Sequence, residues 1–186
     1  MDSVKLFGQS ALLVVDIQER LLSAMPEGAV PQFLKQVRTL ISLAGEFDAP
    51  VLYTEQYPEG LGPTEETIQT TLDEEVDAAY LEKVAFDACS APEAARTFGS
   101  LPRHLIVCGL ETHICVWMTV RRLLEEGHEV IVPFDAVLSR RLPLRDNGLD
   151  LMRQAGATVA NVETLVFGSL ESADHDAFKK FSRLVR

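Results

Sequence analysis

The chain has 186 residues, of which 47% are hydrophobic and 24% are charged, so it is long enough to bury the core of one domain. Its 17 basic and 28 acidic residues give a formal net charge of −11, which argues against nucleic acid or an anionic membrane as a partner, because both require a basic surface. No apolar stretch approaches the roughly 20 residues needed to span a bilayer, and residues 1–10 lack the basic end and apolar core of a signal peptide.

The cysteines and histidines narrow the possible chemistry. The three cysteines, Cys89, Cys108 and Cys115, are odd in number and lack the spacing of a disulfide framework. We therefore expect a reducing compartment and a cytoplasmic location. The four histidines show no metal-ligand spacing, so we expect no metal and no other cofactor.

The first predicted element is a strand over residues 11–16, a continuous apolar run that ends in Asp16. Such a run is typical of a central parallel strand that is covered on both faces. Ligands of open α/β sheets bind just beyond the carboxyl ends of these strands, so Asp16 is a candidate functional acid and Gln18 could line the same pocket. The structural alternative is that Asp16 caps the next segment.

Strands and helices alternate along the remainder of the chain. The predicted elements are a loop (21–28), a helix (31–44), a strand (51–54), an ordered loop (55–64), a polar segment with a short helix (64–77), an extended piece (80–86), a helix (91–98), a strand (105–108), a helix (112–126), a strand (129–133), a loop (134–140), a helix (144–155), a strand (158–160) and two helices (163–170 and 175–185). This alternation predicts an α/β fold, a three-layer α-β-α sandwich with a mainly parallel sheet. We find no linker, so we expect a single domain over residues 1–186.

The stretch around Cys115 is the strongest chemical signal. An apolar strand over residues 105–108 ends at Gly109, and Thr112 is placed to cap the helix that follows. Cys115 then lies in the first turn of that helix, where the macrodipole favours the thiolate. We interpret Cys115 as a nucleophile, and Cys108 as a small buried apolar residue. Adjacent parallel strands could place Asp16 beside the thiol as its base.

Four short motifs follow one another along the chain. They are D-x-Q at residues 16–18, a single lysine at Lys83, G-x-x-T-x-x-C at residues 109–115 and D-A-x-x-S-R at residues 135–140. Together they resemble the isochorismatase-like cysteine hydrolases, the superfamily that includes nicotinamidases and N-carbamoylsarcosine amidohydrolases, over nearly the whole chain. Residues 54–64 further resemble the isochorismatase domain-containing protein 2 branch.

The resemblance implies a catalytic triad of Asp16, Lys83 and Cys115, although a lone lysine by itself is usually a solvated surface group. It also implies a cis peptide bond between Leu110 and Glu111, which would turn the Glu111 N–H, with that of Cys115, toward an oxyanion. We expect a homo-oligomer, as is common in the family, with a contact around Trp117 or the C-terminal helix. The weaker candidates for lining the pocket are Gln18, Thr54 and Trp117.

Two departures from the family pattern bear on the substrate. The nicotinamidase branch has an aspartate–histidine metal site after the second strand, whereas residues 54–57 here contain no histidine, which puts nicotinamide in doubt. The aryl-chorismate branch lacks the nucleophilic cysteine that is present here, so attack on a carbonyl is favoured over vinyl-ether hydrolysis.

The sequence therefore predicts a hydrolase that acts on a small amide or related carbonyl compound through a thioester. One alternative is a family member that has lost its activity and serves as an oligomeric binding protein. The other is a receiver-like signalling domain, which requires clustered acids after its first strand, whereas Asp16 stands alone there.

Overall fold

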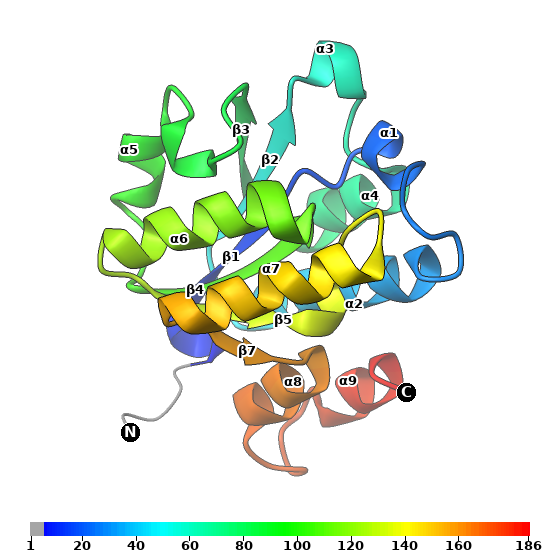
Figure 1. Ribbon diagram of the computed structural model, residues 1–186. Coiled ribbons are helices and arrows are strands. Elements are labelled where there is room, and N and C mark those ends of the chain that lie inside the picture. The colour runs from blue at the N-terminus through cyan, green and yellow to red at the C-terminus, as the bar shows by residue number, and fades with distance from the viewer. Residues whose placement is uncertain (1–5) are drawn as a thin grey trace.

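Two apolar strands, β1 (Ser10–Val15) and β4 (His104–Leu110), form the centre of a seven-stranded sheet in the computed structural model, which describes residues 6–186 (Figure 1). The other strands are β2 (Val51–Gln56), β3 (Ala78–Lys83), β5 (Glu129–Pro133), β6 (Val137–Leu138) and β7 (Thr158–Ala160). The strand order is β3-β2-β1-β4-β5-β7, with β6 paired to β4, and each of these pairings is parallel. The predicted parallel sheet is thus confirmed.

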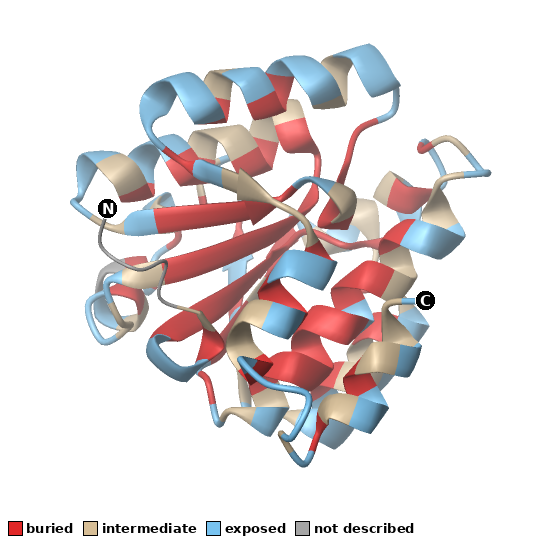
Figure 2. Ribbon diagram, turned by 90° about the horizontal axis from the view of Figure 1, so that it is seen from below, coloured by how far each residue is buried: buried red, intermediate tan, exposed pale blue. Residues whose placement is uncertain are grey.

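Helices cover both faces of this sheet and complete the three layers. One face packs against α2 (Val30–Glu46), α4 (Glu66–Glu75), α8 (Val162–Leu170) and α9 (Phe178–Leu184), and the other against α5 (Ala94–Phe98), α6 (Trp117–Glu125) and α7 (Leu142–Ala155). All six residues of β1 are buried, with Leu12 and Val14 in one core and Leu13 and Val15 in the other. Figure 2 shows the buried strands enclosed by helices with exposed outer turns. The predicted three-layer α/β fold is therefore confirmed.

The C-terminal helix α9 docks through its aromatic side chains, as its sequence pattern predicts. Phe181 is fully buried in the core, and the ring of Phe178 lies 6.0 Å from that of Phe167 on α8. Lys179 and Arg183 are exposed on the opposite side. Because its apolar face packs on its own chain, α9 offers mainly charged groups to any partner.

Local structure differs from the predicted elements at several places. Residues 21–22 and 58–61, predicted as loops, lie in the short helices α1 (Glu19–Leu22) and α3 (Pro58–Leu61). The extended piece predicted at 80–86 is the edge strand β3, which ends at Lys83 because its pairing with β2 ends there. Thr112 is not a helix cap: it begins a π-helical turn (Thr112–Val116), and its buried hydroxyl makes no hydrogen bond among the described residues.

Two further points concern membrane-spanning helices and residues 1–10. Between residues 6 and 186, no helix combines the length and the apolar character that crossing a membrane requires. The prediction about a leader in residues 1–10 falls partly on residues 1–5, which lie outside the described part of the chain.

Candidate active site

The predicted site residues converge where four neighbouring parallel strands end. Val15 at the end of β1 pairs with Gly109 of β4 on one side and with Thr54 of β2 on the other. At the next position outward, Gln56 of β2 pairs with Lys83, the last residue of β3. From β1 to β3 the chain adds strands on one side, and from β4 to β7 it adds them on the other, so the strand order reverses between β1 and β4. Ligands bind at this point in folds of this kind.

The backbones of β4 and β1 lie unusually close together at this edge, at Gly109 and Val15. Gly109 has φ +124°, a conformation that side chains rarely adopt, and a Cβ there would overlap the backbone oxygen of Val15. Glycine is therefore required at this position. It lets the chain turn from β4 into the cysteine-bearing π-helical turn directly beside Asp16.

Asp16 and Lys83 form a buried ion pair. Lys83 Nζ donates to Asp16 Oδ2 at 2.6 Å, and both side chains have 0% exposure. The Thr54 hydroxyl donates to the other carboxylate oxygen, Oδ1, at 2.6 Å, and the Cys115 thiol lies close enough to act on the pKa of Asp16. Burial raises the pKa of Asp16 above its ordinary value of 3.8, while the Lys83 charge and these hydrogen bonds oppose that rise.

The Cys115 thiol lies in the π-helical turn and is 6% exposed. Burial is the main cause that raises its pKa to about 12; the negative charge of Asp16 adds to the rise, whereas Lys83 and the backbone N–H of Glu111 lower it. The shift is opposite in direction to the one expected from the helix start, because burial is the largest cause. With a pKa raised to about 12, the thiol is protonated at neutral pH, and the carboxylate of Asp16 lies close enough to act on its pKa.

Glu111 precedes the π-helical turn, and its backbone is held by a cis peptide bond and by hydrogen bonds. The Leu110–Glu111 peptide bond is cis, and the Glu111 carbonyl accepts from the N–H groups of Ile114 and Val116 at 3.0 and 3.2 Å. The backbone N–H of Glu111 lies near enough to the Cys115 sulfur to lower the pKa of the thiol.

Arg140 holds the side chain of Glu111. Its backbone N–H, Nε and Nη2 donate to the carboxylate at 3.0, 3.1 and 2.8 Å. Burial acts to raise the pKa of Glu111, but these bonds outweigh it and hold the pKa below its ordinary value. The neighbouring Ser139 hydroxyl lies 3.0 Å from His113 Nδ1. Ser139 and Arg140, which end the D-A-x-x-S-R motif, thus hydrogen-bond to residues of the turn that carries Cys115 and to the residue before it.

The weaker candidates have different surroundings. Gln18 is fully buried, and its amide is bonded to backbone atoms of Gln56 and Gly62, so it fastens the loop after β2. Thr54 contacts Asp16 directly. Trp117 is half-buried and packs against the core of α6 and α7. Of these three, the structure brings only Thr54 into contact with the predicted triad.

One residue at the site was missed from the sequence. Gln56 Oε1 accepts a hydrogen bond from Lys83 Nζ at 2.7 Å. The only sequence signal was its place just past the predicted strand of residues 51–54, and a polar residue there is common in loops. Its role depends on the register between β2 and β3, which the sequence does not specify.

The last two residues of β2, Glu55 and Gln56, do not offer free metal ligands. Glu55 accepts from the N–H and hydroxyl of Thr64 at 2.6 and 2.7 Å and from Tyr80 at 3.0 Å, and the Gln56 amide is bonded at both ends. Over residues 6–186, no cluster of three or more histidine, cysteine or acidic side chains could hold a metal ion.

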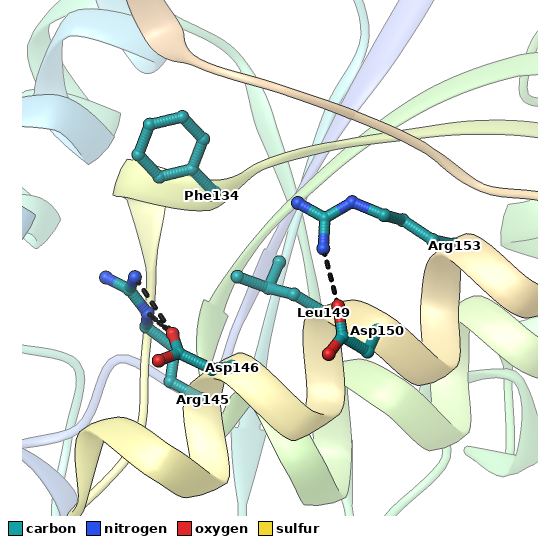
Figure 3. Close-up of a pocket in the computed structure, with 6 residues that line it drawn as sticks. All are labelled: Phe134, Arg145, Asp146, Leu149, Asp150 and Arg153. Atoms are coloured by element: carbon teal, nitrogen blue, oxygen red, sulfur yellow. Dashed lines mark hydrogen bonds and ion pairs between the residues drawn. The ribbon is translucent and has the colours of Figure 1, made fainter.

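A separate hollow lies between α7 and Phe134, in the turn after β5 (Figure 3), and has a cavity volume of about 360 Å³. Its lining consists of Phe134, Arg145, Asp146, Leu149, Asp150 and Arg153. The charged groups pair with one another, at 3.1 Å for Arg145 with Asp146 and at 2.8 Å for Arg153 with Asp150. We interpret it as a solvated helix face, and none of the predicted site residues lines it.

Comparisons with known proteins agree with the fold and the motifs. The model of the isochorismatase domain matches residues 10–164. The secreted isochorismatase effector Isc1 of Phytophthora sojae (strain P6497) is 32% identical over 180 residues, covering 95% of this chain and 84% of that protein. Isochorismatase domain-containing protein 2A of Mus musculus is 32% identical over 177 residues, covering 95% of this chain and 82% of that protein.

A solved structure carries the same arrangement of elements. The MAR1 ribonuclease from Caenorhabditis elegans is similar with a TM-score of 0.88 and 33% identity, over 98% of this chain and 92% of that one. The resemblance drawn from the four motifs, including the domain-containing protein 2 branch, is thereby confirmed. The chain belongs to the isochorismatase family.

Proposed function

We propose that this protein is a cysteine hydrolase that cleaves a small amide or related carbonyl compound, with Cys115 as nucleophile, Asp16 as general base and acid, and Lys83 as the cation that holds the charge of Asp16. One observation carries the proposal: a buried carboxylate, bound to a lysine ammonium at 2.6 Å, lies close enough to a buried cysteine thiol that the two groups shift each other's pKa. The family includes cysteine hydrolases, which agrees with this chemistry.

In the first half of the reaction, Asp16 takes the proton from Cys115 as the sulfur attacks the carbonyl carbon. This transfer is necessary because the thiol, with a pKa raised to about 12, is protonated at neutral pH. The carbonyl oxygen becomes an oxyanion, which the backbone N–H groups of Glu111 and Cys115 stabilise. Asp16 then gives the proton to the leaving amine, the C–N bond breaks and a thioester remains.

In the second half, water attacks the thioester carbon and Asp16 takes a proton from it. The C–S bond breaks, the sulfur recovers the proton from Asp16 and the carboxylic acid leaves. Lys83 stays charged throughout and stabilises Asp16 each time it is ionised. No step requires an oxidant, a reductant or a metal ion.

The test is a panel of small amides with detection of ammonia or amine release, combined with intact-mass analysis for an acyl-enzyme. Cys115→Ala should abolish turnover and covalent adduct formation while its thermal unfolding midpoint stays near that of the wild type. Cys89→Ala is the matched thiol control and should retain activity, since Cys89 lies outside the site. Full activity in Cys115→Ala would remove the nucleophile from the proposal.

The same experiment discriminates the alternatives. An inactive binding protein would turn over no member of the panel and would show no acyl-enzyme, although it would bind a ligand. Because the structural relative from Caenorhabditis elegans is named a ribonuclease, RNA is included in the panel. We expect no cleavage of RNA, since a net charge of −11 disfavours a polyanion.

We also propose a homo-oligomer in a reducing compartment such as the cytoplasm. The three cysteines are free, which suits a reducing environment. Exposed apolar side chains after β2 and β3, with Val84 at 75%, Phe86 at 55% and Tyr57 at 51%, are available to a second copy. Light scattering of the purified chain measures the assembly, and a monomer at micromolar concentration would contradict it.

A further inference from the structure

Gln56, the last residue of β2, is the second short acceptor of the buried Lys83 ammonium. Lys83 Nζ lies 2.7 Å from Gln56 Oε1 and 2.6 Å from Asp16 Oδ2. Its other contacts, the carbonyl oxygens of Ala85 and Phe86, are both at 3.4 Å. Two strong acceptors therefore fix an ammonium whose side chain has 0% exposure.

The Gln56 side chain is itself held in one orientation. Its Nε2 donates to the backbone oxygen of Val84 at 2.6 Å, which assigns Oε1 to the lysine. Its backbone N–H donates to Gln18 Oε1 at 2.8 Å, and the Gln18 amide donates back to the Gln56 carbonyl at 3.1 Å. A connected set of bonds thus runs from the loop after β2, through Gln56 and Lys83, to Asp16.

We propose that Gln56 is a positioning residue for the reaction: its amide oxygen holds the Lys83 ammonium in place, so that Lys83 keeps the carboxylate of Asp16 charged and directed at Cys115. This inference rests on the proposed function. A neutral acceptor suits the task, because it satisfies the ammonium without drawing its charge away from Asp16.

Of the polar side chains at the end of β2, Gln56 is the one that hydrogen-bonds to Lys83. Asp16 follows β1 and Lys83 ends β3, and Cys115, in the turn after β4, lies close enough to act on the pKa of Asp16. The nearest acid on β2, Glu55, turns its carboxylate to Thr64 and Tyr80. A second carboxylate beside Lys83 would compete with Asp16 for the cation.

Two variants separate positioning from simple packing. Gln56→Met keeps the volume and removes the acceptor, so Lys83 loses one of its two short bonds. Gln56→Glu keeps the shape and the acceptor oxygen but adds a negative charge. In both variants Lys83 supports the ionised form of Asp16 less well. The matched control is Gln36→Met, because Gln36 is also buried but its Oε1 has no hydrogen-bond partner among the described residues.

The experiment measures the rate of Cys115 alkylation by iodoacetamide between pH 4 and 9, read by peptide mass spectrometry, together with kcat and KM where a substrate is known. Both Gln56 variants should move the acid limb of the profile upward by about one pH unit and lower kcat about tenfold with KM little changed. Gln36→Met should leave the profile unchanged. Thermal unfolding midpoints report any loss of packing.

The outcomes are distinct. An acid limb that stays in place in both Gln56 variants, with lower unfolding midpoints only, would make Gln56 a packing residue and overturn the inference. A shift of the acid limb in Gln56→Glu but not in Gln56→Met would also overturn it, because the acceptor oxygen would then be dispensable and only the added charge would act. A wild-type protein whose alkylation rate has no acid limb would instead contradict the role of Asp16 in the proposed function.

Discussion

Replacing Lys83 by methionine tests the central ion pair of the site. The ammonium and the carboxylate of Asp16 are 2.6 Å apart and both side chains have 0% exposure. Breaking a buried pair by removing one partner costs about 3–5 kcal/mol, because the remaining charge is left uncompensated. Since the Thr54 hydroxyl still donates to Asp16 in the variant, we expect the free energy of unfolding to fall by about 3 kcal/mol at pH 8.

The loss of unfolding free energy in Lys83→Met should increase with rising pH. Without the lysine, the folded-state pKa of Asp16 rises further above its ordinary value of 3.8. Between these two pKa values, the folded carboxyl binds a proton that the unfolded one has released. The free energy of unfolding of Lys83→Met therefore falls with rising pH, by up to about 1.4 kcal/mol per pH unit. The variant should be closer to the wild type at pH 5 than at pH 8.

The assay is urea unfolding followed by circular dichroism at the two pH values, in a cycle with Asp16→Asn and the double variant. Because the double variant buries no charge at these positions, it should be more stable than the sum of the single losses by about 2 kcal/mol. Lys179→Met, which removes an exposed lysine on α9, should change stability by no more than about 0.5 kcal/mol. Additive losses that are independent of pH would refute the reasoning.

The remaining predictions concern the turn and the pH profile. Gly109→Ala should lower the free energy of unfolding by about 3 kcal/mol or more, measured in urea, because its Cβ would overlap the backbone of Val15 at a positive φ; a loss below about 1 kcal/mol contradicts this. Arg140→Gln should lower kcat about 10- to 100-fold, because the variant no longer holds the Glu111 side chain. The neighbouring Arg141→Gln should leave kcat unchanged. Equal effects of the two variants would contradict the role of Arg140 in holding Glu111. The acid limb of kcat/KM should lie above 3.8, because burial raises the pKa of the general base; a limb at or below 3.8 refutes it.

Several parts of the fold were readable from local pattern. The strand over residues 158–160 lies where the sequence predicts it, and the helix predicted at 144–155 differs from α7 only by an earlier start at Leu142. The helix carries a helical period, with Pro143 near its start and Gly156 at its end, and the short β-prone strand follows this glycine. By contrast, the helices α1 and α3 lack such a period. Both lie in the loop region at the strand ends, where contacts such as Glu19 N–H to Pro63 O hold them.

The sequence by itself indicated the family and the α/β alternation, because motifs and apolar runs are local properties of the chain, and the family resemblance implied the three residues proposed as the triad. Only the tertiary structure decided which groups surround those residues. The register between β2 and β3 places Gln56 on Lys83, and long-range contact places Arg140 on Glu111. Burial, which depends on every layer of the fold, raised the pKa of Cys115 where the helix start alone predicted the opposite, since desolvation is a property of the whole packed core.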